Sequence, residues 1–202
     1  MRLFLAMFTA YLFGSIPTGY LFAKYKNVDL RNTGSGNTGA TNVLRSVGKL
    51  AALLTLVIDV LKGYIVVTFL ADILYNFRMN ITPVELEAIM GLCVVAGHNW
   101  PLFLSFKGGK GVATSAGVLL GLCPKLLMIG LGIWITVFIF TRIVSMASVI
   151  SAAAIPIASY CFKYDNAIRF LAIILAVLTI IRHKQNIKRL IKKEEKRIIV
   201  KI

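Results

Sequence analysis

The segment Asn32–Arg45 gathers residue types that suit the binding of an anion. It contains Gly34, Gly36 and Gly39, and glycine admits backbone conformations in which successive N–H groups converge on one anion. Hydroxyl and amide side chains add neutral hydrogen-bond donors, and Arg45 adds a planar, forked cation. The neutral candidates are Ser35, Asn37, Thr38, Thr41 and Asn42. This chemistry suits a phosphate or a carboxylate, although the composition also fits an ordinary solvated loop.

A second glycine-rich segment, Lys107–Gly111, stands directly before an apolar segment. The N–H groups and the dipole at the start of a helix favour an anion, so Gly108 and Gly109 are candidate backbone donors. Lys107 and Lys110 supply a matching positive charge. The P-loop pattern G-x-x-x-x-G-K-[ST] cannot be laid over this segment. The two lysines could also be plain anchors at the cytoplasmic side of a membrane.

A third polar cluster lies near the C-terminus. His183 and Asn186 are three residues apart and therefore share one face of a helix, with Arg182 and Arg189 close by. The cluster is a candidate site, although the same pattern is typical of the end of an interfacial helix.

Asp59 and Lys62 have the same spacing of three inside a long apolar segment. Charged residues at membrane depth are rare and usually mark function. The alternative is a structural pair in which each charge satisfies the other.

Two other patterns are excluded. The segment Gly34–Gly39 matches G-x-G-x-x-G, with Asp59 at the distance of a ribose-binding acid, but this fingerprint identifies a dinucleotide site only inside a strand–turn–helix unit. Here apolar segments of membrane-span type surround it. Cys93, Cys123 and Cys161 fall in apolar segments without the spacing of metal ligands. We therefore expect neither a nucleotide cofactor nor a metal.

The composition is that of a membrane protein. Of the 202 residues, 58% are hydrophobic, and the mean hydropathy is +0.81, which is too apolar for an ordinary soluble domain. Apolar segments recur along the whole chain, so we predict a single, all-α, polytopic membrane domain over residues 1–202. The net charge of +15 is concentrated in loops and in the tail. This favours anionic lipids and anionic substrates over nucleic acid as partners.

We predict seven transmembrane helices, although the fourth is shorter than the ~20 residues of a full crossing, so that five or six spans stay possible. The predicted spans are Leu3–Ala23, Leu50–Ala71, Val84–Leu104, Val112–Cys123, Leu126–Thr141, Val144–Phe162 and Ala167–Ile181. With the N-terminus outside, most of the 23 basic residues and both glycine-rich segments lie in the cytoplasm with the C-terminus. The tail, residues 183–202, fits a basic amphipathic segment on anionic lipid.

Four motifs resemble those of the bacterial membrane glycerol-3-phosphate acyltransferases that use acyl phosphate, the PlsY family. The motifs are Ser35–Asn42, Gly97-His98, Phe106–Thr114 and Arg182–Leu190. The resemblance extends to Gly14-Ser15 and to Asp59-x-x-Lys62-Gly63, and so covers nearly the whole chain.

The resemblance implies a seven-helix fold in the cell (inner) membrane with the active site facing the cytoplasm. The implied reaction moves a fatty acyl group from acyl phosphate to the 1-hydroxyl of glycerol 3-phosphate, giving lysophosphatidic acid and phosphate without a cofactor. It assigns His183, Asn186 and Asp59 to catalysis and the two glycine-rich segments to the substrate phosphates. The implied partners are both substrates, membrane lipids and the soluble enzyme that makes acyl phosphate.

The sequence does not identify the general base. His98 and His183 are each followed five residues later by Phe103 and Lys188, so neither heads the H-x-x-x-x-D motif of thioester-dependent acyltransferases. A G-x-S-x-G elbow is absent from the sequence, so a covalent acyl-enzyme is not expected. The base could be His183, His98 or a phosphate of the substrates.

The alternative function is a membrane transporter of an organic phosphate, because charged residues and glycine-broken helices also occur in transporters. That function predicts an internal repeat and anion-binding outer loops, and the sequence has neither feature. A lipid-binding scaffold is a third possibility, but it leaves Asp59, Lys62 and the glycine–lysine segment unexplained.

Overall fold

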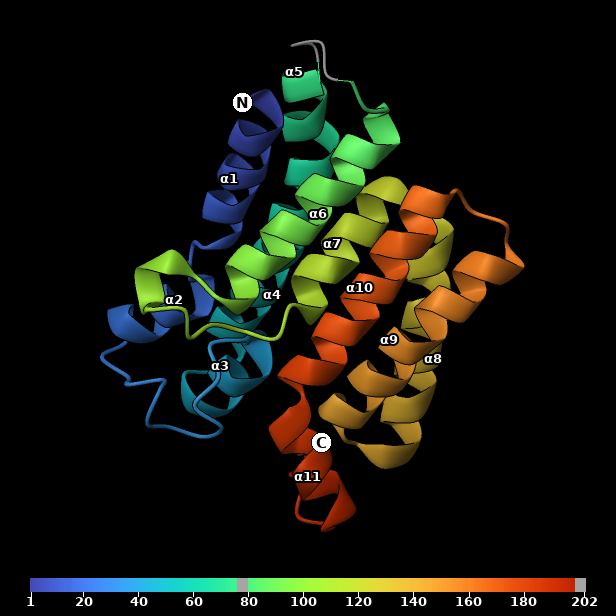
Figure 1. Ribbon diagram of the computed structural model, residues 1–202. Coiled ribbons are helices and arrows are strands. Elements are labelled where there is room, and N and C mark those ends of the chain that lie inside the picture. The colour runs from blue at the N-terminus through green and yellow to red at the C-terminus, as the bar shows by residue number, and fades with distance from the viewer. Residues whose placement is uncertain (76–79, 199–202) are drawn as a thin grey trace. The chain divides into compact units, whose positions relative to one another are not determined.

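The computed structural model describes residues 1–75 and 80–198 of the chain. These residues form helices, turns and loops, with no β-strand among them, which confirms the all-α class for the described part (Figure 1). Positions 76–79, before the third predicted span, and positions 199–202, at the end of the predicted tail, lie outside it. The chain divides into two compact units, Met1–Leu122 and Cys123–Ile202.

The first unit carries both glycine-rich segments. Its elements are α1 (Arg2–Gly14), α2 (Thr18–Tyr25), α3 (Ala40–Ser46), α4 (Lys49–Ile65), the π-helical turn η1 (Val66–Leu70), α5 (Ala71–Tyr75), α6 (Pro83–Asn99), the 3₁₀ turn η2 (Leu102–Leu104) and α7 (Val112–Leu122). α4, η1 and α5 follow one another without a break, so the second apolar segment is helical as far as Tyr75.

Glycines set the close packing of the first unit. α1 packs against α6, and α4 packs against α7. A Cβ atom on Gly14 or Gly97 would overlap a backbone carbonyl of the opposite helix in the first pair. Gly63 and Gly117 have the same relation in the second pair. Small residues at these crossings let the helix backbones approach closely, as in other membrane helix bundles.

The first apolar segment is broken between α1 and α2. Pro17 lacks an amide hydrogen and cannot continue the hydrogen-bond ladder of α1. The Ser15 hydroxyl donates to the Tyr11 carbonyl (2.8 Å) and accepts a hydrogen bond from the N–H of Leu102 (3.4 Å). The break between α1 and α2 is therefore bonded to η2, the short turn that follows α6.

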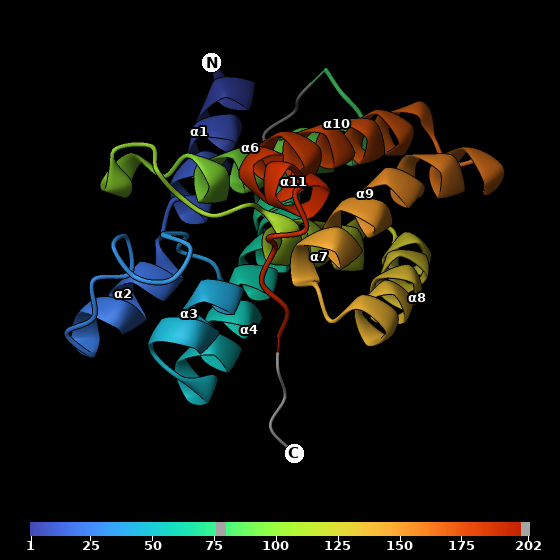
Figure 2. The same ribbon diagram turned by 90° about the horizontal axis from the view of Figure 1, so that it is seen from below.

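The second unit consists of α8 (Pro124–Thr141), α9 (Val144–Cys161), α10 (Asn166–Arg182) and α11 (Lys184–Ile191). α9 packs against both α8 and α10 (Figures 1 and 2). Trp134 donates from its indole N–H to the Ser148 hydroxyl (3.1 Å), and the Ser151 hydroxyl donates to the Gly130 carbonyl (2.6 Å). These bonds join α8 to α9 and use side-chain polar groups that lipid could not satisfy.

In the part of the chain that the structure describes, five helical stretches are long and apolar enough to cross a membrane: Arg2–Tyr25, Lys49–Tyr75, Pro83–Leu104, Pro124–Thr141 and Val144–Cys161. α10 and α11 meet at a bend of 61° and would make a sixth if taken as one broken span. The apolar helix Val112–Leu122 is shorter, at 11 residues. Each of the seven predicted apolar segments thus contains an α-helix, while the count of seven transmembrane helices stays a prediction.

Candidate active site

The loop between α2 and α3, residues 26–39, is the first loop, and it is organised by Asp29. The Asp29 carboxylate accepts hydrogen bonds from the N–H of Arg31 (3.0 Å) and from the side-chain amide of Asn32 (2.8 Å). These bonds stabilise the ionised form and lower the pKa of Asp29. Gly34 and Gly36 each have a φ of +69°, a left-handed conformation that favours glycine. Gly34 and Gly36 therefore let the backbone of this loop adopt positive φ angles.

Asn42 fixes the first loop from the first turn of α3. Its Oδ1 accepts from the N–H of Ser35 (2.8 Å), and its Nδ2 donates to the carbonyls of Leu30 (3.3 Å) and Thr33 (3.0 Å). The residue is 2% exposed. Both amide hydrogens are engaged with the loop backbone, so in this structure Asn42 shapes the loop, where the sequence predicted a direct phosphate ligand.

The other predicted phosphate ligands of this region differ in exposure. Ser35, Gly36 and Arg45 are exposed, and Thr41 is half-buried. Asn37 is half-buried, and its Oδ1 accepts from the N–H of Gly39 (2.8 Å). Ser35 and Arg45 thus have the exposure that a ligand of a soluble phosphate ester requires.

The loop between α6 and α7, residues 100–111, is the second loop, and in this structure its glycine amides bond within the protein. The N–H of Gly108 donates to the carbonyl of Asn99 (3.3 Å), and the N–H of Gly109 donates to the carbonyl of His98 (3.0 Å). Both amides thus bond to the end of α6, and phosphate binding by Gly108 and Gly109 stays a prediction. The physical reason is that the loop folds back onto α6, whose last carbonyls need donors.

The glycines of the second loop instead permit close contact with His98. A Cβ atom on Gly109 would overlap His98 Nε2, and one on Gly108 would overlap the His98 carbonyl and the Pro101 ring. Lys107 is exposed, and Lys110 is half-buried. The second loop therefore packs against His98, and Lys107 and Lys110 flank the two glycines that make this contact.

The two loops are in direct contact. Arg31 of the first loop donates from Nη2 to the carbonyl of Leu104 in the second (3.0 Å). Its guanidinium also lies 5.7 Å from the centre of the Tyr20 ring. The structure therefore joins the first loop to the second through Arg31.

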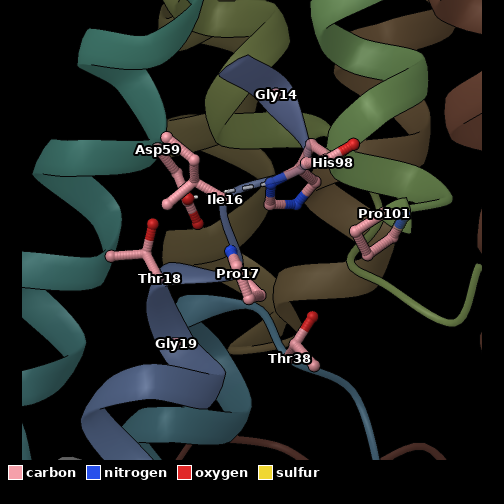
Figure 3. A pocket seen from close by; sticks show the side chains of 10 residues that line it. Gly14, Ile16, Pro17, Thr18, Gly19, Thr38, Asp59, His98 and Pro101 are labelled. Atoms are coloured by element: carbon pink, nitrogen blue, oxygen red, sulfur yellow. Dashed lines mark ion pairs between the residues drawn. The ribbon is translucent and has the colours of Figure 1, made fainter. Parts of the chain in front are cut away.

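A small pocket opens where the two loops meet the break between α1 and α2 (Figure 3). It is lined by Gly14, Ser15, Ile16, Pro17, Thr18, Gly19, Thr38, Asp59, His98 and Pro101. Thr38 belongs to the first loop and Pro101 to the second, so the pocket joins both loops to Asp59 of α4 and His98 of α6.

Asp59 and Lys62 form a buried ion pair at this pocket, 2.8 Å apart, with each side chain 3% exposed. His98 Nδ1 lies 3.7 Å from the same Asp59 oxygen (Figure 3). Lys62 Nζ also donates to the carbonyl of Ile16, in the break between α1 and α2. The predicted pair on one helical face is confirmed, and it has two further partners that sequence spacing could not indicate.

In the second unit, His183 stands at the junction of α10 and α11 and is 2% exposed. Its Nδ1 lies 2.7 Å from the carbonyl of Thr179. A carbonyl only accepts, so Nδ1 carries the proton, and in the neutral ring Nε2 then holds the lone pair that a general base uses.

Asn186 is tied to a carboxylate from the tail. Its Nδ2 donates to Glu195 Oε1 (2.5 Å), and the Ser145 hydroxyl donates to the same oxygen (2.8 Å). Arg189 Nε donates to Glu195 Oε2 (2.6 Å). Burial opposes ionisation of Glu195, but these hydrogen bonds outweigh it and hold the pKa of Glu195 below its usual value. Glu195 therefore organises Asn186 and Arg189.

Sequence reasoning missed Arg31 and Glu195. Arg31 counted only as one of many cytoplasmic charges, because its bond to Leu104 crosses 73 positions of sequence. Glu195 lies in a highly basic tail and was overlooked there, although an acid among so many cations is itself a signal. Among the described residues, no group of three or more His, Cys, Asp or Glu side chains could hold a metal ion.

Residues 4–193 match the family model described as glycerol-3-phosphate acyltransferase. A curated relative of that name from Prochlorococcus marinus (strain MIT 9215) is 44% identical over 198 residues, which cover 96% of each chain. Another from Laribacter hongkongensis (strain HLHK9) is 46% identical over 190 residues, 94% of this chain and 92% of the relative.

Two crystal structures of PlsY (YgiH), described as an integral membrane glycerol 3-phosphate acyltransferase, are similar in fold. The glycerol 3-phosphate form has a TM-score of 0.89 and 37% sequence identity, and the match covers 98% of this chain and 96% of that one. The lysophosphatidic acid form has a TM-score of 0.87 and 35% identity over the same shares.

Proposed function

Because the chain belongs to the glycerol-3-phosphate acyltransferase family, we propose that it transfers a fatty acyl group from acyl phosphate to the 1-hydroxyl of glycerol 3-phosphate. The products are lysophosphatidic acid and inorganic phosphate, and the reaction opens phospholipid synthesis. No cofactor is needed, since acyl phosphate already contains a good leaving group.

The observation that carries this proposal is the contact between the two cationic loops. The Arg31–Leu104 hydrogen bond joins the first loop to the second, and Thr38 and Pro101 of the two loops line one pocket. Both substrates bring a phosphate, so two adjoining loops with cationic side chains suit the pair. Neutralisation and positioning of phosphates then supply much of the catalysis.

We assign Arg45, Lys107 and Lys110 to the substrate phosphates as charged partners, with Ser35 as a neutral donor. Gly36, Asn37 and Thr41 complete the first segment as backbone or side-chain donors. For Asn42, Gly108 and Gly109 the contacts described above support a positioning role in place of direct phosphate binding.

For catalysis we assign His183 as a general base, with the tautomer set by Thr179, and Asn186 as a donor held in place by Glu195. A substrate phosphate is the competing base. For Asp59, whose carboxylate is engaged by Lys62, we assign a supporting role in place of direct catalysis.

The enzyme is proposed to lie in the cell (inner) membrane with seven spans, its N-terminus outside and its active site and C-terminus in the cytoplasm. The distribution of the basic residues supports this orientation. The soluble enzyme that makes acyl phosphate is then a natural partner, because it would deliver the donor to the same side.

The test is product formation by the purified protein with acyl phosphate and radiolabelled glycerol 3-phosphate. Lysophosphatidic acid and phosphate should appear in equal amounts, and acyl-CoA should not replace acyl phosphate. Equal turnover with acyl-CoA would overturn the donor assignment. Uptake of glycerol 3-phosphate into proteoliposomes without acyl phosphate, together with no acylation, would identify a transporter instead.

A further inference from the structure

The ion pair of Asp59 and Lys62 lies between two parts of the first unit that are far apart in the sequence. On one side is the break between α1 and α2, where Lys62 bonds to the carbonyl of Ile16. On the other side is the second loop, which lies on His98. All of these contacts lie within the first unit, and they form a continuous path from the helix break to the lysines of the second loop.

Pro17 cannot supply an amide hydrogen, and carbonyls at an interrupted helix inside a membrane protein must be satisfied by other donors. The Ile16 carbonyl accepts the N–H of Thr18 within the break (3.1 Å). It also accepts Lys62, which reaches it from the last turn of α4 and so ties the break to that helix. The Lys62 charge is buried, and Asp59, one turn earlier on the same helix face, compensates it at 2.8 Å.

The same Asp59 oxygen faces the His98 ring at 3.7 Å. That ring is the surface against which Gly109 lies, with no room for a Cβ atom between them. The His98 carbonyl accepts the N–H of Gly109 as well. Any movement of His98 therefore moves Gly109, and with it Lys110 and Lys107 on either side.

Stability alone does not account for such an arrangement. A buried ion pair is often no more stable than well-packed apolar residues of similar size. A pair that links a helix break to a loop has a different use, because it fixes the position of each element relative to the other.

We infer that Lys62, Asp59 and His98 form a positioning group that sets the place of the second-loop lysines through the His98 ring. The inference rests on the proposed function, because the lysines are assigned there to substrate phosphate. It gives Asp59 and Lys62 a role in the affinity for glycerol 3-phosphate, although neither need touch that substrate.

The test compares Asp59→Asn, Lys62→Met and the double variant Asp59→Asn/Lys62→Met for thermal stability in detergent and for KM and kcat. Each single variant leaves one buried charge without its partner, and the double variant removes both, so the double should be the more stable. It should nevertheless lose roughly 10- to 100-fold in kcat/KM, mainly through a higher KM for glycerol 3-phosphate.

Thr55→Val is the matched control. Thr55 is fully buried one turn before Asp59, and its hydroxyl bonds only to the carbonyl of Ala51 in its own helix (2.7 Å) among the bonds described. This variant should keep wild-type kinetics, which would show that a polar-to-apolar change on this face of α4 is not itself harmful.

Wild-type KM and kcat in the stable double variant would overturn the inference. If the neutral double variant fails to fold, Asp59→Glu decides, because it keeps the charge and displaces the carboxylate by one methylene. A folded Asp59→Glu protein with raised KM supports positioning, and one with wild-type kinetics refutes it. Wild-type enzyme without any acyltransferase activity would instead count against the proposed function.

Discussion

Arg31 and Leu104, 73 positions apart in the sequence, are joined by a hydrogen bond of 3.0 Å from the guanidinium Nη2 to the backbone carbonyl. The bond crosses from the first loop to the second. The contact uses one guanidinium N–H and a backbone carbonyl, so it depends on the reach of the arginine and not on the side chain at position 104. Arg31 therefore links the two loops although both carry positive charge.

Arg31→Ala should weaken the binding of glycerol 3-phosphate without stopping the chemical step. Loss of one charged hydrogen bond costs about 1.5–3 kcal/mol, or roughly a 10- to 100-fold rise in KM if it falls wholly on binding. Steady-state kinetics at saturating acyl phosphate measure the effect. Lys24→Ala, which removes an exposed charge from α2, is the control and should leave KM unchanged. If KM rises equally in both variants, the effect comes from the lower positive charge of the protein and not from the Arg31–Leu104 bond.

Arg45→Ala and Lys107→Ala should each cost a few kcal/mol in kcat/KM, about the 1.5–3 kcal/mol of a hydrogen bond to a charged group or more. Both side chains are exposed on the segments proposed to meet the substrate phosphates. Ser35→Ala should cost less, because a hydroxyl is a neutral donor. Lys49→Ala, an exposed cation at the start of α4, is the control. Unchanged kinetics in both variants would mean that Arg45 and Lys107 are ordinary surface charges with no role in phosphate binding.

Glu195→Gln should lower kcat/KM by roughly 10- to 100-fold through displacement of Asn186. Glutamine keeps the shape but replaces one acceptor oxygen by a donor, so Asn186 and Arg189 cannot both keep their bonds. The catalytic assay measures the loss. A variant of the neighbouring exposed acid, Glu194→Gln, removes the same charge from the tail and should stay active.

The same glutamate predicts a pH dependence of stability. The pKa of Glu195 is lower in the folded protein than its ordinary value of 4.5. Its contribution is therefore fully present above about pH 4.5 and is lost as the pH falls through the folded pKa. Thermal unfolding in detergent should show a steeper loss of stability toward low pH in the wild type than in Glu195→Gln. Parallel curves would mean that other acids control the effect.

The sequence predicted the helices better than it predicted the roles of the loop residues. Apolar segments and the spacing of Asp59 and Lys62 depend on local periodicity, which a sequence displays directly. The bonds of Asn42 and of the Gly109 amide depend on how a loop folds back, which composition does not encode. The sequence predicted the glycines of the second loop as phosphate donors and gave no sign that Gly109 lies against the His98 ring, which only the fold brings there.

Lys193→Gly should stabilise the second unit. Lys193 follows α11 with a φ of +59°, and its N–H donates to the carbonyl of Leu190 (3.0 Å), as in a left-handed helix C-cap. A side chain in this conformation costs about 1 kcal/mol, and glycine avoids that cost. The midpoint of thermal unfolding in detergent should rise, with activity unchanged. Lys192→Gly, at the neighbouring position with ordinary helical angles, should lower it instead.

Gly109→Ala should inactivate the enzyme for a steric reason. Gly109 lies outside the left-handed region, so alanine is conformationally acceptable there, but its Cβ atom would overlap His98 Nε2. The loop must then lift from its support and carry Lys107 and Lys110 with it. Gly132→Ala in α8, where a Cβ atom meets nothing within 4 Å, is the control for insertion and handling and should keep full activity.

A double variant separates this steric explanation from a direct role of Gly109 at a phosphate. His98→Ala removes the ring that the new Cβ atom would strike, so His98→Ala/Gly109→Ala should be as active as His98→Ala alone, with strong non-additivity between the two changes. If Gly109 instead needs its bare backbone for a phosphate, the two losses should add. Kinetics and thermal stability measured on the same four preparations decide between them, since a loss of activity that tracks a loss of folding would refute both explanations.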